Sequence, residues 1–342
     1  MGYNFQQDWK RGEGMVIECA PLEGVTTLWY RRAHRKWFGG VTRYYTPFIS
    51  PTKEHVFTKR ELREIAPAAN AGLPLVPQLL TRNAEDFLWA ASALADMGYG
   101  EVNLNLGCPS GTVCAKGKGA GFLAAPEELD RFLEAVFSRC PVAVSIKTRL
   151  GTEDPAEFGR LLEIYDQYPV CRLIIHPRVR RDQYRGRPRL AAFRDAAGRS
   201  RAPVSYNGDV CTPADAEAVQ ARFPGVGAVM LGRGLVGDPA LARKLAGDPP
   251  ASRAELESFT AELYEAYSSG YGSRHSAVPR MKELWSFLIC LFRDGGKHAK
   301  AIRKAKSPAE YEDRAAAVFR ELELAADLRP DWTDMDWKGW SE

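Results

Sequence analysis

Short apolar and β-branched runs alternate with longer segments of helical character along most of the chain. Such a run, bounded by turn residues, is typical of a strand that is buried on both faces. Eight runs fit this description, at residues 15–20, 43–49, 75–80, 101–106, 142–148, 172–176, 203–207 and 228–231. Helices are predicted between them at residues 84–97, 126–138, 155–167 and 213–222, and several of these open on an Asn, Asp, Thr or Pro.

This order of elements predicts the fold class. Eight strand–helix alternations between residues 15 and 231 are the pattern of an α/β TIM barrel, the (β/α)8 fold. A doubly wound sheet would also alternate strands and helices. However, the pattern G-x-G-x-x-G does not follow the first strand, so the barrel is favoured.

The strand pattern stops after Gly247. From Ala254 to about Leu328 the chain is amphipathic helix, with breaks at residues 268–272, 295–296 and 307–308. We therefore expect a barrel domain at residues 1–247 and an all-helical domain at residues 248–328. A C-terminal tail at residues 329–342 contains three tryptophans and has no predicted role.

Composition narrows the class of protein. Of the 342 residues 45% are hydrophobic, which is ordinary for a globular chain and leaves enough material for a large core. The chain contains neither the apolar segment of a signal peptide nor a run of the roughly 18 apolar residues that cross a bilayer, so we expect a cytoplasmic protein without membrane contact. Seven cysteines without a C-x-x-C pair argue against a disulfide framework and against a metal site. We expect a monomer.

Positive charge is concentrated in two segments, although the formal net charge is only +4. Residues 178–189 contain six arginines and one aspartate, and residues 274–306 contain nine Lys or Arg against Glu283 and Asp294. Each segment is explained equally well as a solvated surface or as a contact for nucleic acid.

Polar residues gather where the predicted strands end. The active site of a TIM barrel lies at the carboxyl ends of its strands, so polar residues there point to function more strongly than polar residues elsewhere. Any one of them could simply close the mouth of the barrel, but seven strand ends together favour an active site. The positions are Pro21 to Gly24, Gln78, Asn105 and Cys108, Lys147, His176, Asn207 to Asp209, and Gly232 to Gly234.

The last two strand ends and Lys147 favour an anionic ligand. Gly208, Gly232 and Gly234 would let backbone N–H groups approach a phosphate, and Arg233 adds charge; a pair of tight turns is the alternative. Lys147 is costly to bury without an anion. Together with Gln78 it would suit the anionic edge of a reduced flavin, and a buried salt bridge to Glu23 is the alternative.

Cys108 stands just past the fourth strand, between Gly107 and Pro109, in a loop expected to face the mouth of the barrel. A thiol there can act as a nucleophile, a metal ligand or a general acid. The spacing of Cys and His argues against metal, and sequence provides no His partner for a nucleophile. Cys114 has no comparable placement and is interpreted as packing.

These segments resemble the tRNA-dihydrouridine synthase family. The likeness spans roughly residues 15–310, with its motifs in the expected order, and among bacterial members it is strongest to the C-type synthases. The segments that carry it are APLEGVT, VPQLL, NLNLGCPSGTVCAKGKGAGFLA, SIKTRLG, IIHPRVRRDQYRG, YNGD, MLGRG and RMKELWSFL. Four positions depart from the usual pattern, namely Leu22, Pro47, Gln183 and Phe287.

The resemblance implies an FMN-binding barrel that reduces a uridine of tRNA to 5,6-dihydrouridine, with NADPH as the usual reductant. It makes Cys108 the proton donor to uracil C5, and Asn105 would orient the base. It assigns FMN contacts to Pro21, Leu22, Glu23, Gln78, Lys147, His176, Asn207, Gly208, Asp209, Gly232 and Arg233. Contacts with tRNA are expected from Arg178, Arg181, Tyr184, Arg280 and Lys282.

Two other interpretations stay open. An FMN barrel acting on a free pyrimidine or a related small molecule would share the flavin chemistry but would not need the basic helical domain. A tRNA-binding folding factor with a vestigial flavin site would not need Cys108, Lys147 and the G-R-G segment intact.

Overall fold

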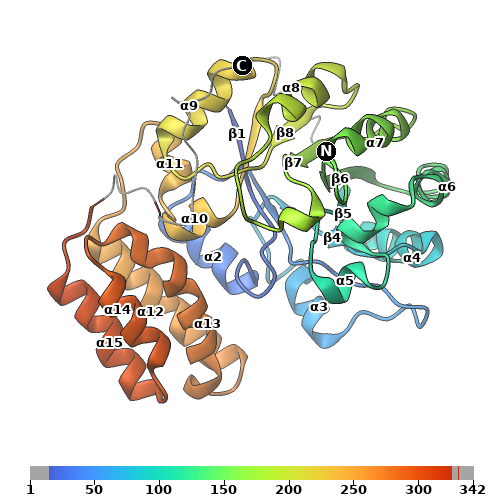
Figure 1. Cartoon of the computed structure of the whole chain (residues 1–342). Helices are drawn as coiled ribbons and strands as arrows, with labels where there is room; N and C mark the ends of the chain where they lie inside the picture. Colours follow the sequence, from blue (N-terminus) through green and yellow to red (C-terminus); the bar gives the residue numbers. More distant parts are fainter. Residues whose placement is uncertain (1–14, 326–329, 331–342) are drawn as a thin grey trace.

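The computed structural model describes residues 15–325 and residue 330. Its centre is a barrel of parallel strands (Figure 1), with neighbouring strands in the order β3-β2-β1-β9-β8-β7-β6-β5-β4. The strands are β1 Val16–Cys19, β2 Arg43–Tyr45, β3 Leu75–Val76, β4 Gln78–Leu79, β5 Glu101–Leu106, β6 Ala143–Arg149, β7 Leu173–His176, β8 Val204–Tyr206 and β9 Ala228–Leu231.

The barrel closes through a single interrupted segment. Strand β3 pairs with β2, and strand β4 pairs with β5, so only Pro77 separates the two ends of the sheet. Proline has no N–H to donate to a neighbouring strand, which interrupts the ladder at that residue. Strands β3 and β4 therefore make up the one strand expected at residues 75–80, and the predicted barrel of eight strand segments is confirmed.

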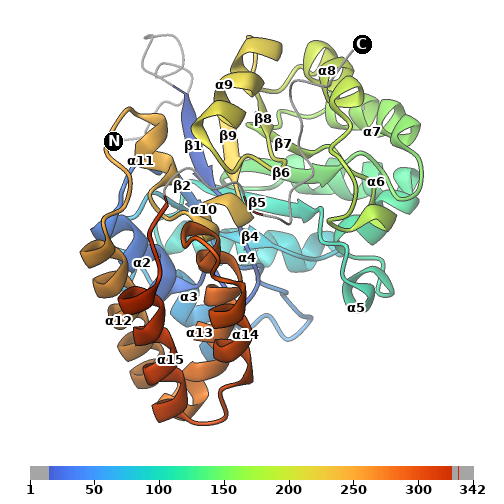
Figure 2. The ribbon, with the colours of Figure 1, turned by 60° about the vertical axis from the view of Figure 1, so that its left-hand side comes forward.

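Helices cover the outside of the barrel (Figure 2). The four helices predicted from sequence are present, and the one expected at residues 155–167 begins with a 3-10 turn. The side chains of Asn83 and Thr212 accept backbone N–H groups at the first turns of the helices Ala84–Asp96 and Pro213–Arg222. The helices are α2 Leu28–Trp37, α3 Lys59–Ile65, α4 Ala84–Asp96, α5 Gly111–Cys114, α6 Pro126–Phe137, α7 Phe158–Tyr165, α8 Leu190–Arg199, α9 Pro213–Arg222, α10 Arg233–Gly237 and α11 Leu241–Leu245.

The C-terminal part of the described chain is a bundle of helices, as predicted. It consists of α12 Arg253–Gly270, α13 Arg274–Leu288, α14 Gly296–Lys304 and α15 Pro308–Glu321, and the breaks fall where the sequence indicated. Helix α12 packs on α2 and helix α13 on α10, so Phe259 of the bundle shares a hydrophobic core with Tyr30 of the barrel. The domain boundary at Gly247 stays a prediction, and the tail at residues 329–342 lies, apart from residue 330, outside the described residues.

The interior of the barrel contains both polar and apolar layers of side chains. The Arg43 Nη1 and Glu101 Oε2 atoms lie 2.7 Å apart, and Tyr45 donates to Glu18 over 3.1 Å. Barrel interiors are usually filled by branched apolar side chains. Here one apolar layer consists of Ala20, Tyr45, Val76, Ile174 and Met230. The polar side chains above that layer, on the strand ends, provide the groups of the candidate site.

Candidate active site at the mouth of the barrel

Cys108 lies two residues beyond the end of β5, in a loop that Asn105 holds in place. The Asn105 Oδ1 atom accepts the backbone N–H groups of Gly107, over 3.1 Å, and of Cys108, over 2.9 Å. Both lone pairs of this oxygen are therefore engaged by the loop. The structure thus gives Asn105 a role in fixing the Cys108 backbone, in addition to the contact with the base that the resemblance implies.

The glycine-rich segment that follows packs directly on Cys108. The Cys108 carbonyl accepts the N–H of Ala120 over 3.0 Å and the Cys114 thiol over 3.4 Å. Gly119 has a φ of +58°, and a Cβ atom at this position would lie 2.9 Å from the same carbonyl oxygen. Only glycine combines this backbone conformation with so close an approach. The interpretation of Cys114 as a packing residue agrees with its position.

The Cys108 thiol is half-buried, and its burial raises its pKa above the usual value. The nearby cations Arg149 and Lys147 act in the opposite direction but do not overcome the burial. A raised thiol pKa keeps the proton on sulfur at neutral pH, whereas an attacking cysteine needs a lowered one. The environment therefore suits a proton donor better than a nucleophile.

Lys147 occupies the next strand, opposite Asn105 in the register of β5 and β6. Burial, together with the charge of Arg149, lowers its pKa to about 7. Within the described part of the chain no hydrogen bond or ion pair engages its amine, and Glu23 forms its ion pair with Arg60 instead. The alternative of a Lys147–Glu23 salt bridge is thus not what the structure contains.

Gln78 is completely buried and lies beside both Asn105 and Asn103. Its Oε1 atom accepts from Asn105 Nδ2 over 2.7 Å, and its Nε2 atom donates to Asn103 Oδ1 over 2.8 Å. The flavin contact predicted for Gln78 would have to use its remaining N–H or lone pair.

The loops after β7 and β8 are joined by a buried ion pair. Arg178 donates to Asp209 over 2.5 Å, and Arg233 donates to the other Asp209 oxygen over 2.7 Å. The Arg178 side chain is only 1% exposed and also donates to the Gly186 carbonyl. The structure therefore gives no support to the tRNA contact predicted for Arg178, because its guanidinium is directed into the protein.

His176 is buried against the same cluster. Its Nε2 atom lies 3.0 Å from Arg178 Nη1, and burial, followed by the surrounding cations, lowers its pKa well below the usual value. A neutral imidazole that accepts at Nε2 carries its proton on Nδ1. His176 can thus offer an Nδ1–H donor to a ligand in the mouth of the barrel.

Tyr184 lies over this cluster on the loop after β7. Its ring is 53% exposed, and the Arg149 and Arg233 guanidinium carbons lie 5.4 Å and 5.3 Å from its centre. Arg149 also donates to the carbonyls of Gly107 and Val179. Arg149 was missed among the predicted site residues, although it is the second basic residue of the K-x-R segment that ends β6.

The other predicted cofactor residues line the same mouth. Pro21 and Leu22 are half-buried in the loop after β1, and Asn207 Nδ2 donates to the Met230 carbonyl over 2.8 Å. A Cβ atom on Gly208 would lie 3.0 Å from Tyr206 Oη, whereas one on Gly232 would make only ordinary contacts. The structure therefore brings Gly208 and Gly232 to one end of the barrel, as expected for neighbouring loops.

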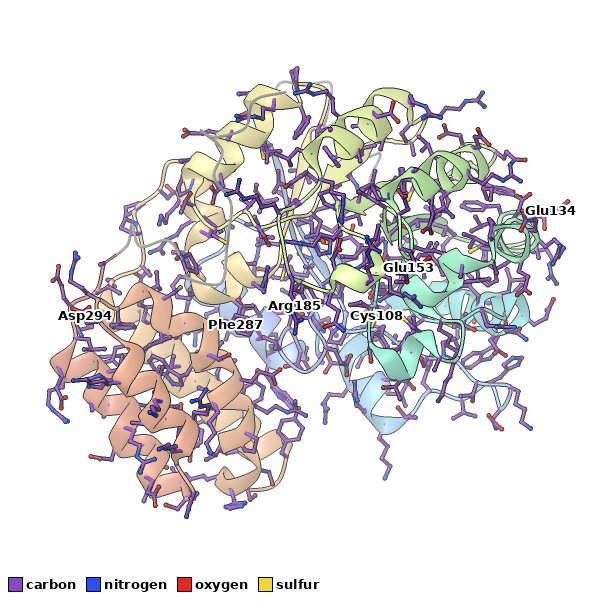
Figure 3. All side chains as sticks on the ribbon, in the orientation of Figure 1. Cys108, Glu134, Glu153, Arg185, Phe287 and Asp294 are labelled. Atoms are coloured by element: carbon purple, nitrogen blue, oxygen red, sulfur yellow. The ribbon has the colours of Figure 1, made fainter. Side chains whose placement is uncertain are left out.

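The residues predicted to bind tRNA have different surroundings in the structure. Arg280 lies against the loop after β1, since a Cβ atom on Gly24 would be 2.8 Å from its Nη1 atom. Lys282 points within the bundle and donates to the Ala305 carbonyl at the end of α14. Arg181 is exposed, with a distant ion pair of 3.9 Å to Glu153. Figure 3 shows Arg185 between Cys108 and Phe287 in that view.

The described residues contain neither a cluster of metal-binding side chains nor a helix that could cross a membrane. Among residues 15–325 and 330, no three His, Cys, Asp or Glu side chains are grouped so that they could hold a metal ion. Within the same residues, every helix is too short or too polar to cross a membrane.

The fold and the site together define an α/β barrel whose mouth holds a thiol with a raised pKa and an amine that has no partner among the described residues. The model of the family described as "Dihydrouridine synthase (Dus)" matches residues 18–324, and the chain belongs to this family of oxidoreductases. The resemblance inferred from the motifs is confirmed at this level.

Bacterial relatives agree with this assignment. A probable tRNA-dihydrouridine synthase of Rhodobacter capsulatus is 32% identical over 266 residues, which cover 75% of this chain and 81% of the relative. One of Rhizobium leguminosarum is 30% identical over 312 residues, covering 91% and 96%. A tRNA-dihydrouridine(16) synthase of Ralstonia nicotianae is 32% identical over 230 residues, covering 65% and 70%. Synthases named B are also among the relatives, at 27% identity, so the C-type subgroup stays a prediction.

Proposed function

We propose that this protein uses FMN and NADPH to reduce a uridine of tRNA to 5,6-dihydrouridine in the cytoplasm, acting as a monomer. The observation that carries the proposal is the pair formed by Cys108 and Lys147 on adjacent strand ends. One is a thiol that burial keeps protonated, and the other is an amine without a protein partner in the described chain.

The residues at the mouth fit the proposed flavin. Lys147 has an unengaged amine, His176 has an Nδ1–H, and Arg233 is half-buried beside the glycines of the last two loops. An amine, a ring N–H and a guanidinium are donors, and FMN offers acceptors on its ring edge and its phosphate. Lys147 would hold the N1–C2 edge of the ring, while Arg233 and the loops after β8 and β9 would hold the phosphate.

FMN supplies, when bound, the hydride for uracil C6, which is electrophilic because the C5=C6 bond is conjugated to the C4 carbonyl. The chain's own residues must then deliver a proton to C5. Cys108 can do so because its proton is retained at neutral pH and its loop is fixed by Asn105 and Gly119. A target uridine must leave the folded tRNA to reach this depth, as in other enzymes that act on bases.

We assign the tRNA contacts to exposed cations rather than to Arg178 and Lys282. Helix α14 presents Lys297, Lys300, Arg303 and Lys304 to solvent, and none of these four is paired with a carboxylate among the described residues. Their spacing in the helix gathers them on one side of α14. Cations without protein partners are the ones that can neutralise phosphates. On the barrel, we assign tRNA contacts to Arg181 and Tyr184, which are exposed on the loop after β7.

The experiment that tests this function combines two measurements on the purified protein. Its absorption spectrum should show the flavin bands, and Arg233→Ala should reduce the amount of flavin retained. With NADPH and unmodified tRNA it should form dihydrouridine, and position 16 is examined first because relatives carry that number in their names. A colourless protein that cannot be reconstituted with FMN would refute the cofactor. Turnover of free uracil but not of tRNA would favour the small-molecule alternative.

A further inference from the structure

Four buried side chains form an unbroken chain of hydrogen bonds beneath Cys108. It runs from the Cys108 N–H to Asn105 Oδ1, from Asn105 Nδ2 to Gln78 Oε1, and from Gln78 Nε2 to Asn103 Oδ1. A last bond runs from Asn103 Nδ2 to Ser145 Oγ over 2.9 Å. The side chains lie on the adjacent strands β4, β5 and β6, where Gln78 is in register with Asn103 and Asn103 with Ser145.

The direction of this chain is fixed at one end. The backbone N–H groups of Gly107 and Cys108 can only donate, so the Asn105 atom that faces them must be its oxygen. The opposite end of the Asn105 amide is then its NH2 group, which requires the oxygen of Gln78. The same reasoning places the NH2 group of Gln78 against the oxygen of Asn103. Each amide therefore sets the orientation of the next.

The four side chains of this network are shielded from solvent. Gln78, Asn103 and Ser145 are 0% exposed and Asn105 is 6% exposed. A buried polar group left without its partner is costly, so it reorients to find another. If Asn103 no longer offered its oxygen, Gln78 could turn over, and Asn105 would lose the acceptor that keeps its own oxygen directed toward the Cys108 loop.

We propose that Asn103 and Ser145 are positioning residues for the Cys108 thiol. They act through Gln78 and Asn105, and neither lies in the Cys108 loop itself. Only the effect of these residues on turnover rests on the proposed function. The position of the thiol can be measured without flavin or tRNA. While the hydrogen bonds between these amides are intact, the thiol stays half-buried and protonated. When one of these hydrogen bonds is lost, the Cys108 loop loosens, the thiol becomes more exposed to solvent, and its pKa falls toward the usual value.

The test is the rate at which iodoacetamide alkylates Cys108 as a function of pH, followed by mass spectrometry of the peptide in a Cys114→Ala background. Asn103→Leu keeps a similar volume but removes the acceptor. It should accelerate alkylation below the thiol pKa by about tenfold for each unit by which that pKa falls. Ser145→Ala, a milder change, should act in the same direction and keeps the test valid if Asn103→Leu fails to fold.

Ser205→Ala is the matched control. Ser205 is another fully buried serine of the barrel interior, and its hydroxyl accepts from Arg172, the residue before β7, rather than from the amide side chains. Its alkylation profile should equal the parental one. Unchanged profiles for Asn103→Leu and Ser145→Ala, or equal changes in Ser205→Ala, would overturn the proposal. Faster alkylation with unimpaired tRNA reduction would instead uphold the positioning role and remove Cys108 as the acid.

Discussion

Arg178 donates to Asp209 over 2.5 Å, and both side chains are almost completely buried, 1% and 4% exposed. This pair joins the loop after β7 to the loop after β8, and Arg233, the first residue of α10, binds the same carboxylate. The most buried arginine of the basic segment at residues 178–189 therefore holds the loops after β7 and β8 together. The positive charge that made this segment a candidate for tRNA is in part internal.

Arg178→Ala should lower the free energy of unfolding by about 3 kcal/mol, because it leaves a buried carboxylate with one partner fewer. Arg181→Ala is the control: this side chain is 61% exposed and 3.9 Å from Glu153, and its loss should cost less than about 0.5 kcal/mol. Urea denaturation of both variants measures the difference. Equal small losses would show that the Arg178–Asp209 pair is not important for stability.

The strand and helix pattern was predictable because each element carries its own periodicity. Even the interrupted strand at residues 75–80 could be located, although the effect of Pro77 on its pairing could not. The direction in which individual side chains point was harder to predict from the sequence. Lys282 is predicted to contact tRNA, and in the structure its amine donates to the Ala305 carbonyl at the end of α14. A cation is stabilised by the carbonyl groups at a helix C-terminus, and the sequence does not show which helix end lies nearby.

The positions of Cys108 and Lys147 at the mouth of the barrel were predictable, because each follows from where a strand ends. The candidate site was not predictable where a residue acts through a long-range contact. Arg149 reaches the carbonyls of Gly107 and Val179, which are 42 and 30 residues away in the sequence. Only the folded barrel brings these loops together.

Lys147→Met should stabilise the flavin-free protein in a pH-dependent manner. The pKa of Lys147 is lowered to about 7 in the folded protein, so between about pH 7 and its unfolded pKa the unfolded chain binds one proton more. The cost of burying the lysine is complete below about pH 7 and disappears as the pH rises toward the unfolded value. The gain from Lys147→Met should thus be largest at pH 6 and small at pH 10.

Urea titrations of the parent and of Lys147→Met across this range provide the measurement. A gain that does not vary with pH would mean that the lysine is not deprotonated on folding.

Charge reversal on α14 should weaken tRNA binding and reduce its salt dependence. If Lys300 and Arg303 each neutralise one phosphate, Lys300→Glu combined with Arg303→Glu should lower the slope of log K against log salt by about 1.4 to 1.8. Reduction of the flavin by NADPH should not change. Filter binding of tRNA at several salt concentrations measures the slope.

Arg160→Glu on α7 is the control for this variant, because it changes an exposed arginine on a helix of the barrel. It should leave the slope near the parental value. If the control and the α14 variant lower the slope equally, the effect is one of net charge and α14 is not a tRNA contact.

The most direct test of the account is a single turnover of the reduced enzyme with unmodified tRNA, comparing the parent with Cys108→Ala and with Cys114→Ala. The parent and Cys114→Ala should form about one dihydrouridine for each flavin reoxidised. Cys108→Ala should retain flavin and tRNA but form dihydrouridine about 10² to 10⁴ times more slowly, which is the usual contribution of a positioned general acid. Dihydrouridine formation by Cys108→Ala at the parental rate, or flavin reoxidation by the parent without dihydrouridine, would contradict it.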